Sequence, residues 1–200
     1  MILLTGATGF LGEYLIRELL GTEEELRVLV RNADQRKLPW RSMVEVVDGD
    51  ILDLVSLRKA FKGIDTVVHA AAYVSFWKKQ KELVRQVNVE GTANLINLAI
   101  EQEKPPRFLH VSSIAAIGRA KKGLSNEETA WKKSDAASTY AISKREAEYE
   151  VFRGIAEGLE ASIVNPGLIL GPTQDWESGT GKIFSQVYKG LPFYKNGMAG

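Results

Sequence analysis

The chain has 200 residues, of which 44% are hydrophobic and 26% are charged, and its formal net charge at pH 7 is +1. This composition is typical of a globular protein with one sizeable core, and the near-neutral charge gives no indication of a nucleic acid or an anionic membrane as partner. The absence of cysteine excludes disulfides, thiolate metal sites and cysteine nucleophiles. The two histidines, His69 and His110, are too few for a histidine-based metal site, so we expect no bound metal.

No apolar run reaches the length of a membrane span. Residues 1–20 lack the basic start and the unbroken apolar core of a signal peptide. A cytoplasmic location is therefore the default expectation.

The first twenty residues combine a strand pattern, a glycine-rich turn and a helix pattern. An apolar strand is predicted over 2–5 and an amphipathic helix over 11–20, with Gly6, Gly9 and Gly12 spaced three apart between them. In such a turn the first glycine permits the tight bend, the second lets a phosphate approach, and the third lets the helix pack against the strand. The helix N-terminus then offers N–H groups to a pyrophosphate. The alternative is a glycine-rich turn that binds nothing.

Strand and helix patterns alternate along the rest of the chain. Further strands are predicted over 26–30, 44–47, 66–69, 107–112 and 161–165, and further helices over 53–61, 81–101, 139–156 and 182–189. This alternation predicts an α/β fold with a doubly wound parallel sheet (a Rossmann fold) between two helix layers. The stretches 119–136 and 171–181 are predicted to be loops.

The residues after the second strand indicate which dinucleotide is bound. A carboxylate about twenty positions past the glycines would bind the ribose 2′-OH of NAD, but Arg31 stands here. Its guanidinium fits a 2′-phosphate, and Arg36 and Lys37 add positive charge. We therefore expect NADP rather than NAD, unless Arg31 is simply a solvated loop charge.

The third strand is followed by Asp50 and Ile51. Asp50 could accept a hydrogen bond from the adenine amino group, and Ile51 could pack on the adenine ring. The alternative is that Asp50 caps the helix predicted over 53–61.

Polar residues suited to carbonyl chemistry occur in the second half of the chain. Tyr140 and Lys144 lie four residues apart, which puts both on one face of a helix. The strand 107–112 ends in two hydroxyls, Ser112 and Ser113. Asn88 interrupts a long helix pattern, either for a function or because it is exposed on the helix surface.

Together these segments resemble the extended short-chain dehydrogenases/reductases of the NAD-dependent epimerase/dehydratase superfamily. The matching segments occur in the family's order and are Thr5-Gly6-Ala7-Thr8-Gly9-Phe10-Leu11-Gly12, Asp50-Ile51-Leu52-Asp53, His69-Ala70-Ala71-Ala72, Asn88-Val89-Glu90-Gly91-Thr92, Ser112-Ser113, Tyr140-Ala141-Ile142-Ser143-Lys144 and Asn165-Pro166-Gly167. The resemblance covers nearly the whole chain.

The resemblance implies four catalytic residues. Tyr140 would be the general acid that protonates a carbonyl oxygen, and the base in the reverse direction. Lys144 would stabilise the phenolate and hydrogen-bond the nicotinamide ribose. Ser113, or failing that Ser112, would orient the substrate oxygen, and Asn88 would organise a proton-relay water.

The same resemblance assigns the cofactor contacts. Thr8, Phe10 and Leu11 would bind the dinucleotide together with the three glycines. Ala70 and Ala71 would line the adenosine side. The residues Pro166, Gly167, Tyr140 and Lys144 would contact the nicotinamide half.

Within this family, the chain looks most like the dihydroflavonol-reductase-like branch. Ile114 and Ala115 follow Ser113 where dehydratases of the family carry an acidic pair. The resemblance therefore implies reduction of a carbonyl, or oxidation of an alcohol, on a small hydrophobic or aromatic substrate. Alternatives are a sugar-nucleotide epimerase that retains NAD, and a non-catalytic NADP-binding sensor.

Family members are longer than this chain and carry a smaller substrate-binding domain after the cofactor half. We therefore expect residues 1–170 to form the dinucleotide-binding domain, and 171–200 to begin a substrate-binding region that is cut short. Tyr73, Phe76 and Trp77 would line the substrate pocket or pack against that further region. The family also implies a possible homodimer through the helices that hold Asn88 and Tyr140.

Overall fold

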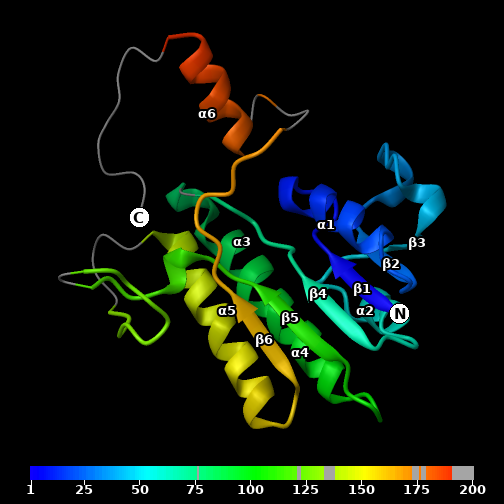
Figure 1. The fold of residues 1–200 in the computed structure, drawn as a ribbon. Helices are drawn as coiled ribbons and strands as arrows, with labels where there is room; N and C mark the ends of the chain where they lie inside the picture. The colour runs from blue at the N-terminus through cyan, green and yellow to red at the C-terminus, as the bar shows by residue number, and fades with distance from the viewer. Residues whose placement is uncertain (76, 121–122, 133–137, 173–175, 177–178, 191–200) are drawn as a thin grey trace.

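The computed structural model describes residues 1–75, 77–120, 123–132, 138–172, 176 and 179–190. It contains a six-stranded parallel sheet in the order β3-β2-β1-β4-β5-β6 (Figure 1). The strands are β1 (Ile2–Thr5), β2 (Leu26–Val30), β3 (Glu45–Asp48), β4 (Thr66–His69), β5 (Arg107–Val111) and β6 (Ala161–Val164). The predicted doubly wound α/β fold is therefore confirmed.

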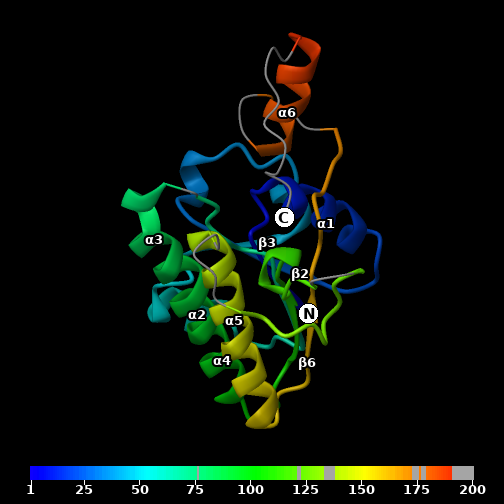
Figure 2. The same cartoon turned by 90° about the vertical axis from the view of Figure 1, so that its left-hand side faces the viewer.

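Helices cover the sheet on both faces. The α-helices are α1 (Phe10–Leu20), α2 (Leu54–Ala60), α3 (Lys81–Arg85), α4 (Gly91–Ile100), α5 (Thr139–Ala156) and α6 (Gly179–Tyr188), of which α6 stands apart from the sheet (Figure 1). Figures 1 and 2 show α2, α4 and α5 together on one face of the sheet and α1 on the other. Two hydrophobic clusters follow from this arrangement, one under each helix layer.

The central strand explains how one sheet supplies both clusters. All four residues of β1 are buried. Successive side chains of a strand point to opposite faces, so Leu3 enters the cluster under α2, α4 and α5, whereas Leu4 enters the cluster under α1. Strands β1 and β2 are buried at every position, and burial on both faces accounts for their largely apolar sequences.

The helix predicted over 81–101 is confirmed in its extent, but one turn inside it is not α-helical. The segment is α3, then a π-helical turn over Gln86–Glu90, then α4. In that turn the Gly91 N–H donates to the Gln86 carbonyl, five residues back. Hydrophobic periodicity does not detect the one extra residue that a π turn inserts, and such turns occur often at functional sites.

The other boundaries differ less. The helix over 139–156 is confirmed as α5, where Ser138 caps the first turn by accepting from the Ala141 N–H. α6 begins at Gly179 and not at 182, so the predicted loop 171–181 is shorter than expected. The stretch 119–136 was predicted to be a loop, and its described residues, 119–120 and 123–132, contain no helix or strand.

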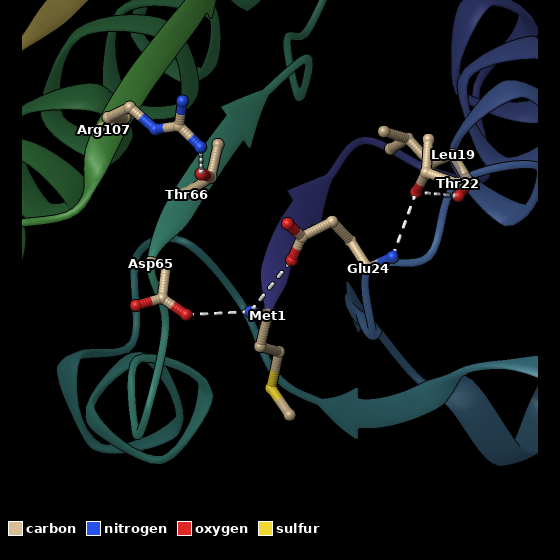
Figure 3. Close-up of polar contacts among 7 residues, drawn as sticks. All are labelled: Met1, Leu19, Thr22, Glu24, Asp65, Thr66 and Arg107. Carbon is tan, nitrogen blue, oxygen red and sulfur yellow. Dashed lines mark hydrogen bonds and ion pairs between the residues drawn. The ribbon is translucent and has the colours of Figure 1, made fainter.

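The amino-terminal edge of the sheet is held by ion pairs and hydrogen bonds. The amino group of Met1 lies 2.9 Å from the Asp65 carboxylate and 3.5 Å from that of Glu24 (Figure 3). Arg107 donates to the hydroxyl of Thr66 on the neighbouring strand. These contacts lie at the edge opposite the carboxyl ends of the strands, where ligands bind in such sheets.

No described helix is both long enough and apolar enough to cross a bilayer. In the same part of the chain, no three acidic or histidine side chains gather as a metal site would require.

Leu57 and Leu54 of α2 provide a test of the packing. Leu57 is fully buried, whereas Leu54 is 46% exposed. We expect Leu57→Ala to lower the free energy of unfolding by about 2–5 kcal/mol, because it leaves a cavity in the core. The matched variant Leu54→Ala should cost less than about 1 kcal/mol. Urea unfolding measures both, and equal losses would contradict this description of the core.

Candidate active site

The glycine-rich turn joins β1 to α1 at the carboxyl edge of the sheet. Gly6 has a φ of +83°, and a Cβ there would lie 2.5 Å from the Ala70 carbonyl carbon. A Cβ on Gly12 would overlap the carbonyl oxygen of Gly6, so this close approach of helix and strand requires glycine. Gly9 is exposed and precedes α1, whose first turn has no side-chain cap. The N–H groups of that turn are therefore suited to bind a diphosphate.

The remaining predicted contacts lie along the same edge of the sheet. Thr8 is exposed, whereas Phe10, Leu11, Ala70 and Ala71 are half-buried. The segment after β6 reaches the same edge, because the Tyr14 hydroxyl of α1 donates to the Pro172 carbonyl at 2.6 Å. Pro166, in that segment, accepts from the Ile114 N–H at 3.0 Å, and Gly167 follows it.

The predicted adenosine side brings Arg31 and Asp50 together. Their side chains form an ion pair of 3.7 Å, and the Arg31 side chain is 58% exposed. The alternative that Asp50 caps α2 is wrong, because Asp53 accepts from two N–H groups of the first turn. Ile51 is buried and packs against Gly91 of α4.

A hollow lies beside the glycine-rich turn. It is lined by Ala7, Thr8, Glu13, Arg36, Lys37, Leu38, Pro39 and Trp40. Arg36 also donates to the carbonyl of Arg31 at 2.9 Å, which ties this basic segment to the end of β2. Arg36 and Lys37 therefore line a hollow shared with Ala7 and Thr8 of the turn, whereas the Arg31 side chain pairs with Asp50.

α5 brings Tyr140 and Lys144 to the end of β5. Burial raises the pKa of Tyr140, and a hydrogen bond with the Ser113 side chain opposes this. Lys144 is buried, and its ammonium donates to the Val111 carbonyl at 2.8 Å. Burial lowers the pKa of Lys144 to about 8, against the opposing charge of Glu148.

The two adjacent serines have different partners. Ser113 is half-buried, and its side chain lies beside that of Tyr140. Its hydroxyl also caps the short turn Ile114–Ala116 by accepting from the Ala115 N–H. Ser112 is buried, and its hydroxyl donates to the Glu148 carboxylate at 2.6 Å. Of the two candidates, Ser113 is the one placed beside the phenol.

Asn88 is buried, so the alternative that it lies exposed on a helix surface is wrong. Its side-chain oxygen accepts from the Tyr73 N–H, and its amide donates to the Tyr73 carbonyl and to the Ser143 hydroxyl. Ser143 in turn donates to the Tyr140 carbonyl. Both amide hydrogens of Asn88 are thus used within the protein. Its part in a proton relay stays a prediction.

A chain of hydrogen bonds that we did not predict runs from the glycine-rich turn to Asn88. The Thr92 hydroxyl donates to the Asn88 carbonyl at 2.6 Å, so it accepts from His69 Nε2–H at 3.0 Å. His69 Nδ1 is then the acceptor for the Thr5 hydroxyl at 2.8 Å, and Thr5 accepts from the Ala71 N–H. Every donor in this series of hydrogen bonds has an acceptor, which buried polar groups require.

His110 lies beside this series of hydrogen bonds, and the centroid of its ring is 5.1 Å from that of the His69 ring. Its Nε2 is 3.4 Å from the Lys144 ammonium. Burial lowers the pKa of His69 to about 3 and that of His110 well below its usual range, and the charge of Lys144 contributes to both shifts. Both rings are therefore neutral. The signal in the sequence was a histidine at or near the end of each of two apolar strands.

Two of the three aromatic residues proposed for a substrate pocket lie within the described residues. Tyr73 is half-buried and packs against the core, whereas Trp77 is 76% exposed. Phe76 lies outside the described residues.

Known proteins were compared with this chain. A model of the "NAD dependent epimerase/dehydratase family" matches residues 2–194. The chain belongs to this family. It is 35% identical over 170 residues to "Sterol demethylase protein B" of Methylococcus capsulatus, and 31% identical over 194 residues to a "Putative dihydroflavonol 4-reductase" of Synechocystis. These matches cover 85% and 96% of this chain, but only 52% and 56% of the relatives, so the chain spans about half their length.

Solved structures of the family have the same fold. The crystal structure of gox2253 is 35% identical and superposes with a TM-score of 0.82, over 93% of this chain and 57% of the other. A UDP-glucose 4-epimerase of Thermus thermophilus in complex with NAD is 30% identical, with a TM-score of 0.78, over 96% and 64%. The predicted family is therefore confirmed, and its members are NAD(P)-dependent enzymes.

The neutral histidines predict how stability depends on pH. Unfolding restores a pKa near 6.5 to His69 and His110, so below that pH the unfolded chain binds more protons than the folded one. We expect the free energy of unfolding to fall by about 1.4 kcal/mol per pH unit for each histidine, between about pH 6 and pH 5. Urea unfolding at several pH values measures this slope. His69→Gln should reduce the slope by half, and an unchanged slope would show that His69 does not titrate on unfolding.

Proposed function

We propose that this chain binds NADP(H) and acts as an oxidoreductase that reduces a carbonyl, or oxidises an alcohol, on a small hydrophobic or aromatic substrate. The observation that carries the proposal is that α5 places Tyr140 and the buried Lys144 one helical turn apart at the end of β5, with Ser113 beside the phenol. Relatives from the same family include one named as a dihydroflavonol reductase, which supports a reductase.

The residues present fit a dinucleotide. The uncapped first turn of α1 would hold the diphosphate, and Arg31 and Arg36 would meet a 2′-phosphate. Asp50 and Ile51 would lie near the adenine, Ala70 and Ala71 near the adenosine, and Pro166 and Gly167 near the nicotinamide. When bound, the nicotinamide supplies or accepts the hydride.

The chain's own residues would manage the proton. Ser113 would orient the substrate oxygen by a hydrogen bond, and the Tyr140 phenol would donate its proton to that oxygen, which completes the alcohol. Burial raises the pKa of Tyr140, which keeps the phenol protonated at neutral pH, as reduction requires. Lys144 would then stabilise the phenolate by its positive charge.

Two alternatives remain as outcomes of experiment. A sugar-nucleotide epimerase that retains NAD is supported by the likeness to the UDP-glucose 4-epimerase. A non-catalytic NADP sensor would bind cofactor without turnover.

A cytoplasmic location is still the expectation from the cysteine-free composition.

We also propose a homodimer, for which the surface of α5 provides support. Tyr149, Phe152 and Ile155 on this helix are large apolar side chains between 42% and 51% exposed. Arg145 lies over the ring of Tyr149, 4.9 Å from its centroid. Such a row of apolar side chains on one helix is typical of a surface that packs against another protein.

Tyr140→Phe tests the catalytic proposal. Removing the phenol hydroxyl should lower turnover at least about a hundred-fold, because the proton donor is lost, with NADPH affinity nearly unchanged. The measurement is NADPH oxidation with a panel of aromatic aldehydes and ketones. Tyr149→Phe, on an exposed part of the same helix, is the control. Full activity of Tyr140→Phe would rule out this mechanism.

Arg31→Asp tests the choice of cofactor. We expect NADPH affinity to fall about ten- to a hundred-fold, because a charged hydrogen bond to phosphate is replaced by repulsion, whereas NADH affinity should not fall. Titration followed by nicotinamide fluorescence measures both. Arg58→Asp is the matched control, since its side chain is 59% exposed and ion-paired with Glu101 of α4's C-terminal end. A preference of the wild type for NADH, or NAD retained through purification, would favour the epimerase.

A further inference from the structure

A buried carboxylate lies on the inner face of α5. Glu148 is 3% exposed, and it follows Lys144 by one helical turn and Tyr140 by two. The spacing places all three side chains on one face of the helix. Because a carboxylate is almost never fully buried without partners, the contacts of Glu148 need an explanation.

Glu148 contacts three separate parts of the chain. Its Oε1 accepts from the Ser112 hydroxyl and from the Asn165 amide, both at 2.6 Å. Its Oε2 accepts from Arg145 on the same helix at 2.9 Å. One carboxylate therefore joins α5 to the residue after β5 and to the residue after β6.

Two of these contacts connect Glu148 to Ser113. Ser112 precedes it in the chain, and the Asn165 amide also donates to the Ser113 carbonyl at 3.0 Å. Tyr140 is carried by the helix that holds Glu148. Glu148 thus connects both partners of the Ser113–Tyr140 hydrogen bond.

We propose that Glu148 is a positioning residue, which holds the helix of Tyr140 and Lys144 in register against Ser113. The inference rests on the proposed function, because it assigns Glu148 a part in arranging that site. Glu148 would act through the groups that it contacts, which are Ser112, Asn165 and Arg145.

Glu148 also acts on Lys144 through its charge. Lys144 faces His110 from β5 and, further off, His69 from β4, and both rings are neutral. On α5, the Glu148 carboxylate raises the pKa of Lys144 against the effect of burial, while Arg145 pairs with the other carboxylate oxygen. Loss of this negative charge should therefore lower the pKa of Lys144 further and leave it neutral at a lower pH.

The first experiment separates charge from shape. Glu148→Gln keeps a side-chain oxygen for Ser112 and Asn165 but removes the charge. Glu150→Gln is the matched control, since Glu150 lies on the same helix and pairs with Arg153 at 2.9 Å, outside the site. NMR of protein labelled with ¹³C at lysine Cε reports the titration of Lys144 without any need for turnover. We expect Lys144 to titrate at lower pH in Glu148→Gln than in wild type or Glu150→Gln; the same midpoint in all three would overturn the charge effect.

The second experiment tests the positioning. Glu148→Leu removes every contact of the carboxylate, and kcat should fall about ten- to a hundred-fold, because small misplacements of reacting groups are costly, with the Kd for NADPH little changed. Glu148→Gln should recover most of kcat near neutral pH, with the alkaline limb of its pH profile moved to lower pH. A protein that only lost stability would not show this split. If Glu148→Leu does not fold, Asn165→Ala, which removes the link to the Ser113 carbonyl, takes its place.

The two proposals fail in different ways. Unchanged kcat in Glu148→Leu or Asn165→Ala, in a wild type that turns over substrate, overturns the positioning role alone. A wild type that folds but neither binds NADPH nor turns over substrate overturns the proposed function, and with it the positioning role that rests on it. The lysine titration is still read in that case, as a test of the contact between Glu148 and Lys144.

Discussion

The ammonium of Lys144, buried where β5 ends, is the constraint on which the site depends. A buried cation is costly unless acceptors and opposite charge surround it. Here the Val111 carbonyl accepts from it, and Glu148 one turn along supplies negative charge. The same cation disfavours protonation of His69 and His110, so both rings act as neutral hydrogen-bonding groups. Burial is the larger cause of both shifts, and the charge of Lys144 adds to it.

Neutral His69 makes the next part of the arrangement possible. Only a neutral ring has both a donor and an acceptor nitrogen, and His69 uses them for Thr92 and Thr5. The chain of hydrogen bonds then reaches the carbonyl of Asn88 within the π turn, and the Asn88 side chain leads through Ser143 to the backbone of Tyr140. The turn that would bind phosphate and the helix that carries the phenol are thus parts of one network. Dense polar networks of this kind fix geometry when all their members are satisfied.

The two sides of the sheet's carboxyl edge are closed differently. On the side of α1, glycines let the helix approach the end of β1 closely, because the backbone of Gly12 lies against that of Gly6. On the side of α5, polar side chains make the contact, since Ser112 and Asn165 both donate to Glu148. The first arrangement leaves N–H groups available to a ligand, whereas the second uses its polar atoms within the protein. This division agrees with a phosphate site at one side and proton chemistry at the other.

The sequence by itself determined the fold class, the family and most of the element boundaries, because apolar periodicity and glycine spacing are local properties of the chain. It also placed Tyr140 and Lys144 on one helix face, since four residues make about one turn. It did not determine the π turn, the burial of Asn88, the choice of Ser113 over Ser112 as neighbour of the phenol, or the cap of α2. Nor did it indicate the parts of His69 and Glu148. Apart from Arg145 on the same helix, their partners lie between 17 residues away, at Asn165 for Glu148, and 64 residues away, at Thr5 for His69. Only the parallel packing of the strands and α5 brings these groups together.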